Sequence, residues 1–320
     1  MTQLKTVFLG TPDFSIPALK LLHNHPMVDL KHVVTMPDRP AGRGKKLHSP
    51  AVAEFAKSNE ISLLQTSNIN KEEEFLNKLV KEGVDLIVVL AFAQFLKERL
   101  LKLPKYGCFN IHTSLLPTYR GAAPIQCAIL NGDQKTGVTI QRMVKKMDAG
   151  DIAMQAEVDI IENETFETLY PKLKNQCTIT LDKFIHDLSE NKITYIKQDE
   201  SKVSFAPTLK KCDGFLDFKN ETREKILNKV RALIPWPGCW FYIGNKRFKL
   251  LEVELEPGEL TPATVSLEMG TLSVGCTDGK IIRLTKLQCE GKKVCSDSEI
   301  INGFKSRNQC NQIIINPKKG

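Results

Sequence analysis

The first 190 residues of the chain alternate between short apolar runs and helical patterns, and this alternation restricts the possible fold more than any other feature. The run VDLIVVL (84–90) contains five consecutive apolar residues, as expected for a strand buried on both faces of a parallel sheet. Further strands are predicted at 5–10, 29–35, 108–112, 136–143 and 151–160, with helices at 15–25, 49–58, 71–83, 123–130 and 164–188. The alternation predicts an open, mainly parallel α/β sheet with helices on both faces.

The pattern changes near residue 190. Residues 190–209 lack helical periodicity and are predicted to form a linker, so the first domain is predicted to span 1–189. Residues 210–320 begin with one helical pattern at 221–234 and continue as short strand-like runs with hairpin turns at Gly244-Asn245 and Asp278-Gly279. Several short strands in a basic segment of this length favour a small β-barrel, of which an OB-like barrel is the leading candidate.

Charge is distributed unevenly over a chain whose net charge is +8. Residues 201–320 contain 20 Lys and Arg against 13 Asp and Glu, a balance of +7, so almost all of the excess lies in the C-terminal part of the chain. This asymmetry favours a polyanionic partner for that part, although a basic, soluble domain without such a partner would look the same.

Several classes of protein are disfavoured by what the sequence lacks. No apolar run is long enough for a membrane span, and the N-terminus begins as a strand without the pattern of a signal peptide. The nine cysteines include no C-x-x-C pair and are interpreted as reduced thiols of a cytoplasmic protein. The first turn reads GTPDF where a dinucleotide-binding protein would carry G-x-G-x-x-G, and no metal-ligand cluster is evident.

Polar residues with catalytic potential follow the predicted strand 108–112. Asn110 and His112 are two residues apart, so they point to the same face at the carboxyl end of that strand, where open α/β sheets bind ligands. An amide that donates to an oxyanion and an imidazole that moves a proton suit the attack of an amine on a carbonyl. Asp148, between two later strands, can orient the imidazole or a bridging water. Taken alone, an N-x-H pair is also compatible with a purely structural strand end.

A resemblance extends over nearly the whole chain. The segments GTPDFSIPAL, MPDRPAGRGKKLHSPAV, FNIHTSLLPTYRGAAPIQ, TGVTIQRM and KKMDAGDI occur in this order, followed by FAPTLKKCDGFLDF and VRALIPWPGCW. Together they resemble the methionyl-tRNA formyltransferase family. The N-x-H, SLLP and Asp-x-Gly motifs are common to folate-dependent formyltransferases, whereas PDRPAGRGKK is typical of the tRNA enzymes.

The resemblance implies a Rossmann-like formyltransferase fold with a C-terminal OB-like β-barrel. It implies transfer of formyl from 10-formyltetrahydrofolate, the co-substrate, to the α-amine of methionyl initiator tRNA, without a metal. By residue, it implies catalysis by Asn110, His112 and Asp148, folate binding by Ser114, Leu115, Leu116 and Pro117, and tRNA contacts by Arg39, Arg43, Lys45 and Lys46. Whether His112 or a water held by Asp148 takes the first proton is left open. A cytoplasmic monomer is expected.

The segment 91–97 departs from the family pattern. The family commonly has Ala-Tyr-Gly and then Ile-Leu-Pro here, whereas this chain has Ala-Phe-Ala-Gln-Phe-Leu-Lys. Alanine in place of glycine restricts φ, so folate binding is expected to be retained with an altered pocket wall.

The nucleic-acid contacts are expected in two places. The first is a long cationic loop, MPDRPAGRGKKLH (36–48), whose Arg43 resembles the residue that the family inserts into the acceptor stem; a solvated loop is the alternative. The second is the barrel, where the candidate phosphate contacts are Lys210, Lys211, Lys246, Arg247 and Lys249. Trp236 and Trp240 are predicted to be barrel core, with stacking on bases as the alternative.

Other readings of the sequence are a formyltransferase acting on a glycinamide or amino-sugar nucleotide, a formylfolate hydrolase, and a tRNA-binding module with a decayed site.

Overall fold

The computed structural model describes residues 3–41, 46–267 and 270–305, which divide into two compact units. The N-terminal unit contains the residues up to Pro124 together with Lys135–Asp159 and Tyr170–Ala206. The C-terminal unit contains Ile125–Gln134, Ile160–Leu169 and the residues from Pro207 onward. Each unit is described by itself below.

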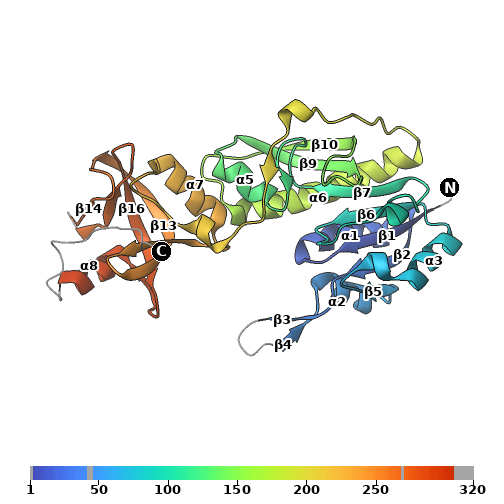
Figure 1. The fold of residues 1–320 in the computed structure, drawn as a ribbon, viewed down its shortest axis with the longest axis horizontal. Helices are drawn as coiled ribbons and strands as arrows, with labels where there is room; N and C mark the ends of the chain where they lie inside the picture. The colour runs from blue at the N-terminus through green and yellow to red at the C-terminus, as the bar shows by residue number, and fades with distance from the viewer. Residues whose placement is uncertain (1–2, 42–45, 268–269, 306–320) are drawn as a thin grey trace. The chain divides into compact units, whose positions relative to one another are not determined.

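Among the described residues, the N-terminal unit is built on a seven-stranded sheet of order β10-β9-β7-β6-β1-β2-β5 (Figure 1). Five neighbouring strands run parallel, β9 is antiparallel to β7, and β10 is antiparallel to β9. The strands are β1 (Leu4–Gly10), β2 (Val28–Thr35), β5 (Leu63–Gln65), β6 (Leu86–Leu90), β7 (Gly107–His112), β9 (Lys135–Arg142) and β10 (Ile152–Asp159). The prediction of a mainly parallel α/β sheet is therefore confirmed.

Apolar side chains cover both faces of this sheet. One face carries Val7, Leu9 and Ile87, which pack with Leu76 and Leu79. The helices of this unit are α1 (Ile16–Asn24), α2 (Ala51–Ser58), α3 (Glu73–Glu82), α4 (Glu98–Leu101) and most of α6 (Phe166–Ser189), with short 3-10 turns at Asp13–Ser15, Ile69–Lys71 and Glu200–Lys202. Helix α5 (Pro124–Leu130) belongs to the C-terminal unit apart from its first residue. Burial on both faces explains why β6, in the interior of the sheet, is apolar throughout.

The cationic segment 36–48 is not the plain loop predicted from the sequence. Two three-residue strands, β3 (Arg39–Ala41) and β4 (Lys46–His48), pair in antiparallel fashion on either side of residues 42–45, which lie outside the described residues. The β3–β4 hairpin was missed because the strands are short and one contains Pro40. Its base is anchored where Ser49 and Gln65 both donate to Asp38, at 2.8 and 2.7 Å.

A second small pairing joins distant parts of the chain. Strand β8 (Arg120–Gly121) follows the SLLP turn and pairs in parallel with β11 (Phe205–Ala206). Here Gly121 adopts φ +129°, and a Cβ at this residue would lie 2.4 Å from the backbone oxygen of Ala206. Only glycine fits this close approach of two backbones.

The C-terminal unit contains a curled antiparallel sheet, of which β13, β14 and β16 are labelled in Figure 1. Its strand order is β12-β13-β16-β15-β14, with β17 beside β16. Its elements are a 3-10 turn at Lys211–Gly214, α7 (Arg223–Leu233), β12 (Cys239–Ile243), β13 (Lys246–Glu259), β14 (Val265–Ser266), β15 (Ser273–Gly275), β16 (Lys280–Cys289), β17 (Val294–Ser296) and α8 (Asp297–Lys305). Phe241, Phe248 and Leu284 are among its buried residues. The sheet is consistent with the predicted OB-like fold, and the turn at Gly244-Asn245 joins β12 to β13 as expected.

The eight cysteines in the described part of the chain are all free thiols. None of the described helices combines the length and apolar character that crossing a membrane requires.

Candidate active site

Asn110 and His112 are held at the carboxyl end of β7 by the side chains that alternate with them. Phe109 and Ile111 are buried on the opposite face, where the ring of Phe109 packs 4.8 Å from that of Phe184 of α6. A shift of one residue would exchange these apolar side chains with the polar pair, so burial fixes the register. The two polar side chains thus share one face, as the strand period predicts.

Asp148 completes a group of three with these residues. Its Oδ1 lies 3.4 Å from Asn110 Nδ2, and its Oδ2 lies 3.8 Å from His112 Nδ1. Asp148 has a left-handed backbone with φ +50°, and only 11% of its side chain is exposed. The structure therefore brings together Asn110, His112 and Asp148, which are separated by up to 38 residues in the sequence.

Two further donors fix the Asp148 carboxylate. The backbone N–H of Gly121 donates to Oδ2 at 2.9 Å, and Gln141 Nε2 donates to Oδ1 at 2.8 Å. Gln141 lies on β9 directly opposite Asn110. Because an ionised carboxylate only accepts hydrogen bonds, this ring of donors suits the charged form of Asp148.

The tautomer of His112 follows from its other contact. His112 Nε2 lies 2.9 Å from the carbonyl oxygen of Tyr119, and a carbonyl only accepts, so Nε2 carries a proton. In the neutral ring the lone pair then belongs to Nδ1, which faces Asp148 Oδ2. A proton taken up by this ring arrives at Nδ1, beside a carboxylate that stabilises the imidazolium.

The predicted folate turn, Ser114–Pro117, is closed by its own hydrogen bonds. Ser114 Oγ donates to the carbonyl of Thr118 at 2.6 Å, and the Leu116–Pro117 peptide bond is cis. The Leu116 N–H donates to Thr139 Oγ1 at 3.1 Å. These hydrogen bonds hold the turn in place. Because the Leu116 N–H already donates to Thr139, a bound heterocycle would have to use other polar groups of the turn. Folate binding by this turn remains a prediction.

The segment 91–97 is tied down by Gln94. Its Oε1 accepts from the N–H of Ile69 at 2.8 Å, and its Nε2 donates to the carbonyl of Thr66 at 2.7 Å. The left-handed residue of this segment is Ala91, at φ +52°, rather than Ala93. The alanine that replaces the family glycine therefore carries no unfavourable positive φ. The Phe95 side chain is 71% exposed beside it.

Comparison with known proteins places the chain in a family. A family model described as formyl transferase matches residues 4–183, and one described as formyl transferase, C-terminal domain, matches residues 208–305. Methionyl-tRNA formyltransferase of Clostridium acetobutylicum is 40% identical over 308 residues, which cover 94% of this chain and 96% of that protein. The chain belongs to the methionyl-tRNA formyltransferase family. The enzyme of the same name from Bacillus thuringiensis subsp. konkukian is also 40% identical, with the same coverage.

Solved structures share the fold at lower identity. The N-formyltransferase of Helicobacter canadensis, in complex with folinic acid and dTDP-3-aminofucose, is 21% identical with a TM-score of 0.65, covering 88% of this chain and 99% of that chain. The sugar 3N-formyl transferase WlaRD is 22% identical with a TM-score of 0.66, covering 92% of this chain and 100% of that chain. These structural similarities show that the chain has the formyltransferase fold.

The four residues predicted to contact tRNA all belong to the β3–β4 hairpin region. Arg39 is exposed at the start of β3. Arg43 and Lys45 lie outside the described residues, and the Lys46 side chain does as well, although its backbone begins β4. The hairpin therefore carries Arg39 to the surface, while tRNA contact stays a prediction for all four.

One expectation about the C-terminal unit is wrong. Trp236 is predicted to be core, but it is 55% exposed, because it lies between two prolines in the turn that follows α7. Trp240 is half-buried, with Arg247 stacked 4.5 Å from its ring. Of the predicted phosphate contacts, Lys210, Lys211, Lys246 and Lys249 are exposed and Arg247 is half-buried.

Three residues of the site were not found from the sequence. Gln141 could have been found, since it lies on the same face as Thr139 of a predicted strand, and these two residues are the β9 partners of Asn110 and His112. Arg120 and Gln198 had no local signal. Arg120 is 1% exposed, and Gln198 reaches the Asp148 loop from 50 residues further along the chain.

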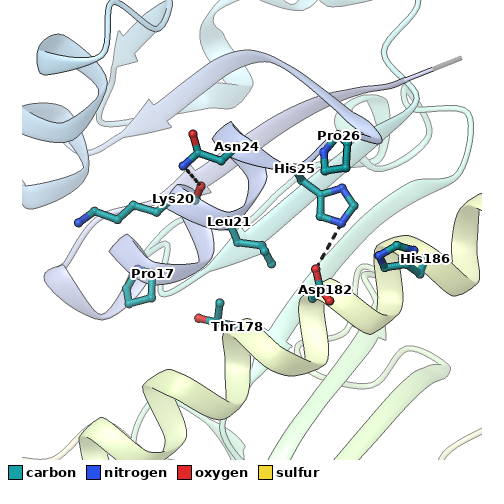
Figure 2. Close-up of a pocket in the computed structure, with 9 residues that line it drawn as sticks. All are labelled: Pro17, Lys20, Leu21, Asn24, His25, Pro26, Thr178, Asp182 and His186. Atoms are coloured by element: carbon teal, nitrogen blue, oxygen red, sulfur yellow. Dashed lines mark hydrogen bonds and ion pairs between the residues drawn. The ribbon is translucent and has the colours of Figure 1, made fainter. Parts of the chain in front are cut away.

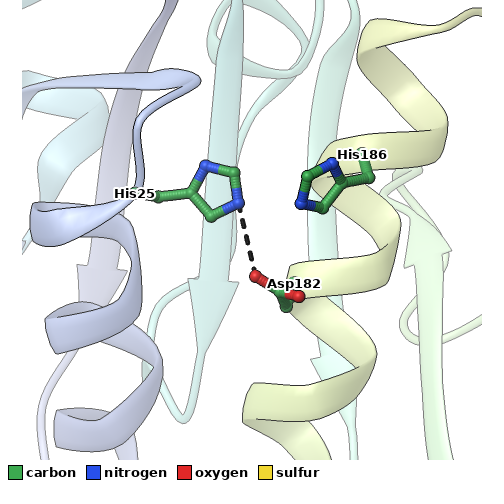
Figure 3. A group of neighbouring side chains, drawn as sticks. All are labelled: His25, Asp182 and His186. Atoms are coloured by element: carbon green, nitrogen blue, oxygen red, sulfur yellow. Dashed lines mark ion pairs between the residues drawn. The ribbon is translucent and has the colours of Figure 1, made fainter.

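Outside this site, one group of described residues has the composition of a metal centre. His25, Asp182 and His186 place ligand atoms within 4.8 Å of one another, at the side of an open pocket of about 450 Å³ between α1 and α6 (Figures 2 and 3). His25 Nδ1, however, accepts a hydrogen bond from the Met27 N–H at 3.2 Å, so Nε2 carries the proton and faces Asp182 Oδ1 at 3.3 Å. A histidine that ligates a metal normally donates from its second nitrogen, which is the reverse arrangement. We interpret His25 and Asp182 as a structural pair.

This pair predicts a pH dependence of stability. Burial lowers the pKa of His25, as does the neighbouring His186 ring, against the opposing effect of Asp182. An unfolded histidine takes up its proton near pH 6.5, whereas the folded one resists it, so acidification below that pH favours the unfolded chain. The free energy of unfolding of the wild type is expected to fall between pH 7 and 5 more steeply than that of His25→Gln, by at most about 1.4 kcal/mol per pH unit. Denaturant titrations at several pH values measure this difference. The exposed neighbour His23 supplies the control His23→Gln, and identical slopes in wild type and His25→Gln would contradict the assignment.

Proposed function

We propose that the protein transfers the formyl group of 10-formyltetrahydrofolate to the α-amino group of methionyl initiator tRNA, for the initiation of translation. The observation that carries the proposal is the convergence of Asn110 and His112 on Asp148 at the carboxyl edge of the sheet. This group has the parts that amine attack on a formyl carbon requires. The 40% identity with enzymes named methionyl-tRNA formyltransferase supports the choice of acceptor.

The first step forms a C–N bond and an oxyanion. The methionine amine attacks the formyl carbon, and the carbonyl π electrons move onto the formyl oxygen. Asn110 Nδ2 carries two protons, of which one faces Asp148 Oδ1 and the other is available for that oxygen. A preorganised donor of this kind typically contributes about 10²- to 10³-fold to the rate.

The second step returns a proton to folate. The attacking nitrogen loses a proton as the bond to carbon forms, and the leaving folate nitrogen gains one as its bond to carbon breaks. We place the intermediate proton on His112 Nδ1, because Nε2 is committed to the Tyr119 carbonyl. Asp148 Oδ2, 3.8 Å away, stabilises the imidazolium and keeps the ring oriented.

The β3–β4 hairpin is the proposed grip on the tRNA acceptor end. It carries Arg39 at the surface and brings Arg43, Lys45 and Lys46 into the same segment. Four cations in so short a segment suit contacts with phosphates. The basic C-terminal unit, through residues such as Lys246 and Lys249, would hold the body of the tRNA.

Replacing Arg43 by alanine is expected to raise KM for charged tRNA about tenfold or more, since losing a hydrogen bond between charged groups costs roughly 1.5–3 kcal/mol. Binding of folate should be unaffected. Steady-state kinetics with each substrate varied in turn measures both quantities, and the slope of log KM for tRNA against log salt should become shallower. Lys81→Ala, an exposed cation in the last turn of α3, is the control. An unchanged KM and salt slope in Arg43→Ala would remove the proposed role of the hairpin.

The deciding experiment mixes purified protein with 10-formyltetrahydrofolate and methionyl initiator tRNA, with methionyl elongator tRNA as the control. Formylation of the initiator and discrimination against the elongator are expected. A dTDP-linked amino sugar belongs in the same assay, because structures sharing the fold include an N-formyltransferase complexed with dTDP-3-aminofucose. Turnover of the sugar nucleotide without turnover of initiator tRNA would overturn the proposal.

A further inference from the structure

The segment that follows α6 turns back to the candidate active site. Ile196 forms an isolated bridge with Ile152 at the start of β10. Further along, β11 pairs with β8, next to the SLLP turn. Gln198, between these two attachments, reaches the loop that carries Asp148. Both ends of the segment are thus fixed on strands near the site, which limits how far Gln198 can move.

The amide of Gln198 holds the backbone of the Asp148 loop. Its Nε2 donates to the carbonyl oxygen of Asp148 at 2.8 Å and to that of Gly150 at 2.7 Å. Asp148 lies in the left-handed region, which costs a residue with a Cβ about 1–2 kcal/mol. Such a conformation persists only where its surroundings fix it, and these two hydrogen bonds span the residue after it.

A buried arginine fixes the orientation of that amide. Arg120 donates from Nε and Nη2 to Gln198 Oε1, at 3.0 and 2.8 Å. A guanidinium has no acceptor, so the Gln198 oxygen must face Arg120 and its nitrogen must face the two carbonyls. Arg120 is 1% exposed, and a buried charge needs its partners because losing one leaves it unpaired.

The charge of Arg120 is balanced at the surface. Its Nη2 also donates to Glu200 Oε1 at 2.8 Å, and Lys146 donates to Glu200 Oε2 at 2.9 Å. The hydrogen bonds from Arg120 and Lys146 lower the pKa of Glu200 to about 2, so the carboxylate is ionised near neutral pH. Lys146 itself belongs to the loop that leads into Asp148, which links the loop to the segment a second time.

Arg120 also acts on Asp148 through its own backbone. The next residue, Gly121, donates its N–H to Asp148 Oδ2 at 2.9 Å. The side chain of Arg120 therefore fixes the main chain of Asp148 through Gln198, while the strand it begins fixes the carboxylate. We propose that Gln198 and Arg120 are positioning residues, which hold Asp148 in the orientation that the chemistry at His112 and Asn110 requires. The consequence for catalysis rests on the proposed function, whereas the positioning itself does not.

The Gln198 amide makes two sets of contacts: its oxygen accepts from Arg120, and its nitrogen donates to the carbonyls of Asp148 and Gly150. The substitution Gln198→Glu keeps the first set, or half, of this arrangement and removes the second. Glutamate keeps the size of the side chain and an acceptor for Arg120, so folding is expected to be retained. It loses the two N–H donors and sets a carboxylate against the carbonyls of Asp148 and Gly150. Gln198→Met, an apolar side chain of similar size, removes both halves and leaves the charge of Arg120 without that acceptor. Gln176→Glu on α6, a half-buried glutamine whose Nε2 donates to Thr180, is the matched control.

Two measurements test the proposal. In amide hydrogen exchange, Gln198→Glu is expected to raise the exchange rate of residues 146–151 about tenfold or more, with the rest of the sheet unchanged. In formyl transfer, kcat is expected to fall about 10²-fold, as for a catalytic group misplaced by about 1 Å, with KM for tRNA within about twofold of the wild type. Gln176→Glu should change none of these.

The outcomes distinguish this proposal from the proposed function. Unchanged exchange in residues 146–151 of Gln198→Glu would overturn the positioning role, whatever acceptor the enzyme uses. Raised exchange with a kcat within about twofold of wild type would equally overturn it. A wild type that formylates no methionyl-tRNA would overturn the proposed function alone, since the exchange measurement stands without any acceptor.

Discussion

Replacing Asp148 by asparagine is expected to lower kcat for formyl transfer by about 10²- to 10⁴-fold while leaving KM for tRNA nearly unchanged. The side chain keeps its shape but loses the negative charge beside His112 Nδ1. The new amide also brings two N–H donors into a site whose other groups, the Gly121 N–H and the Gln141 amide, are already donors. Whichever way the amide is turned, its nitrogen faces one of these donors, so neither the charge nor the orientation is preserved.

Initial rates with saturating folate, measured against the concentration of methionyl initiator tRNA, give kcat and KM for this variant. Asp159→Asn, an exposed aspartate at the end of β10, removes the same charge from the same unit and is expected to be neutral. A kcat for Asp148→Asn within a few-fold of the wild type would exclude Asp148 from the chemistry. The proposed stabilisation of a proton on His112 Nδ1 by Asp148 would then play no part in the reaction.

Adding a single methyl group at Gly121 is expected to damage both stability and turnover. In Gly121→Ala the new Cβ would lie 2.4 Å from the Ala206 backbone oxygen, closer than real side chains approach, and φ +129° is unfavourable for any L-residue. The β8–β11 pairing must open, and the Gly121 N–H moves away from Asp148 Oδ2. We expect a loss of at least about 2 kcal/mol in unfolding free energy and about 10² in kcat.

Gly83→Ala separates backbone strain from steric conflict. Gly83 at the end of α3 has φ +64°, and nothing lies within 4 Å of the position its Cβ would take. This variant should lose about 1 kcal/mol of stability and no activity. Thermal unfolding and turnover of both variants, measured side by side, test the argument. Equal losses of stability and of turnover in the two variants would show that the close approach of β8 and β11 does not matter for the activity.

The positions of the candidate catalytic residues could be predicted from the sequence where the two-residue period of a strand, or the order of the strands, determines which side chains lie together. The buried residues of β7 fix which side chains face the sheet edge, so the pairing of Asn110 with His112 could be predicted. Asp148 could be placed near them because it lies between two strands of the same sheet. The apolar run of β6 likewise predicted a strand that is buried on both faces.

The rest depends on contacts between residues far apart in the chain. Gln198 lies in a segment without periodicity, and its hydrogen bonds with Asp148 and Arg120 span 50 and 78 residues. A buried arginine is also the opposite of what residue type suggests. Trp236 was misjudged because a proline-flanked turn, rather than apolar character, decides its exposure. Short strands such as β3 carry too few residues for alternation to be visible.

The position of β11 has a consequence for where the catalytic unit ends. A fragment stopping at residue 183, the limit of the N-terminal family match, would keep all seven strands of the sheet and the three residues Asn110, His112 and Asp148. It would lack Gln198 and the partner strand of β8. During synthesis, the same reasoning means that the site cannot assume its final form until Ala206 has left the ribosome. Enzyme fragments or fusions intended to retain formyl transfer should therefore extend at least to that residue.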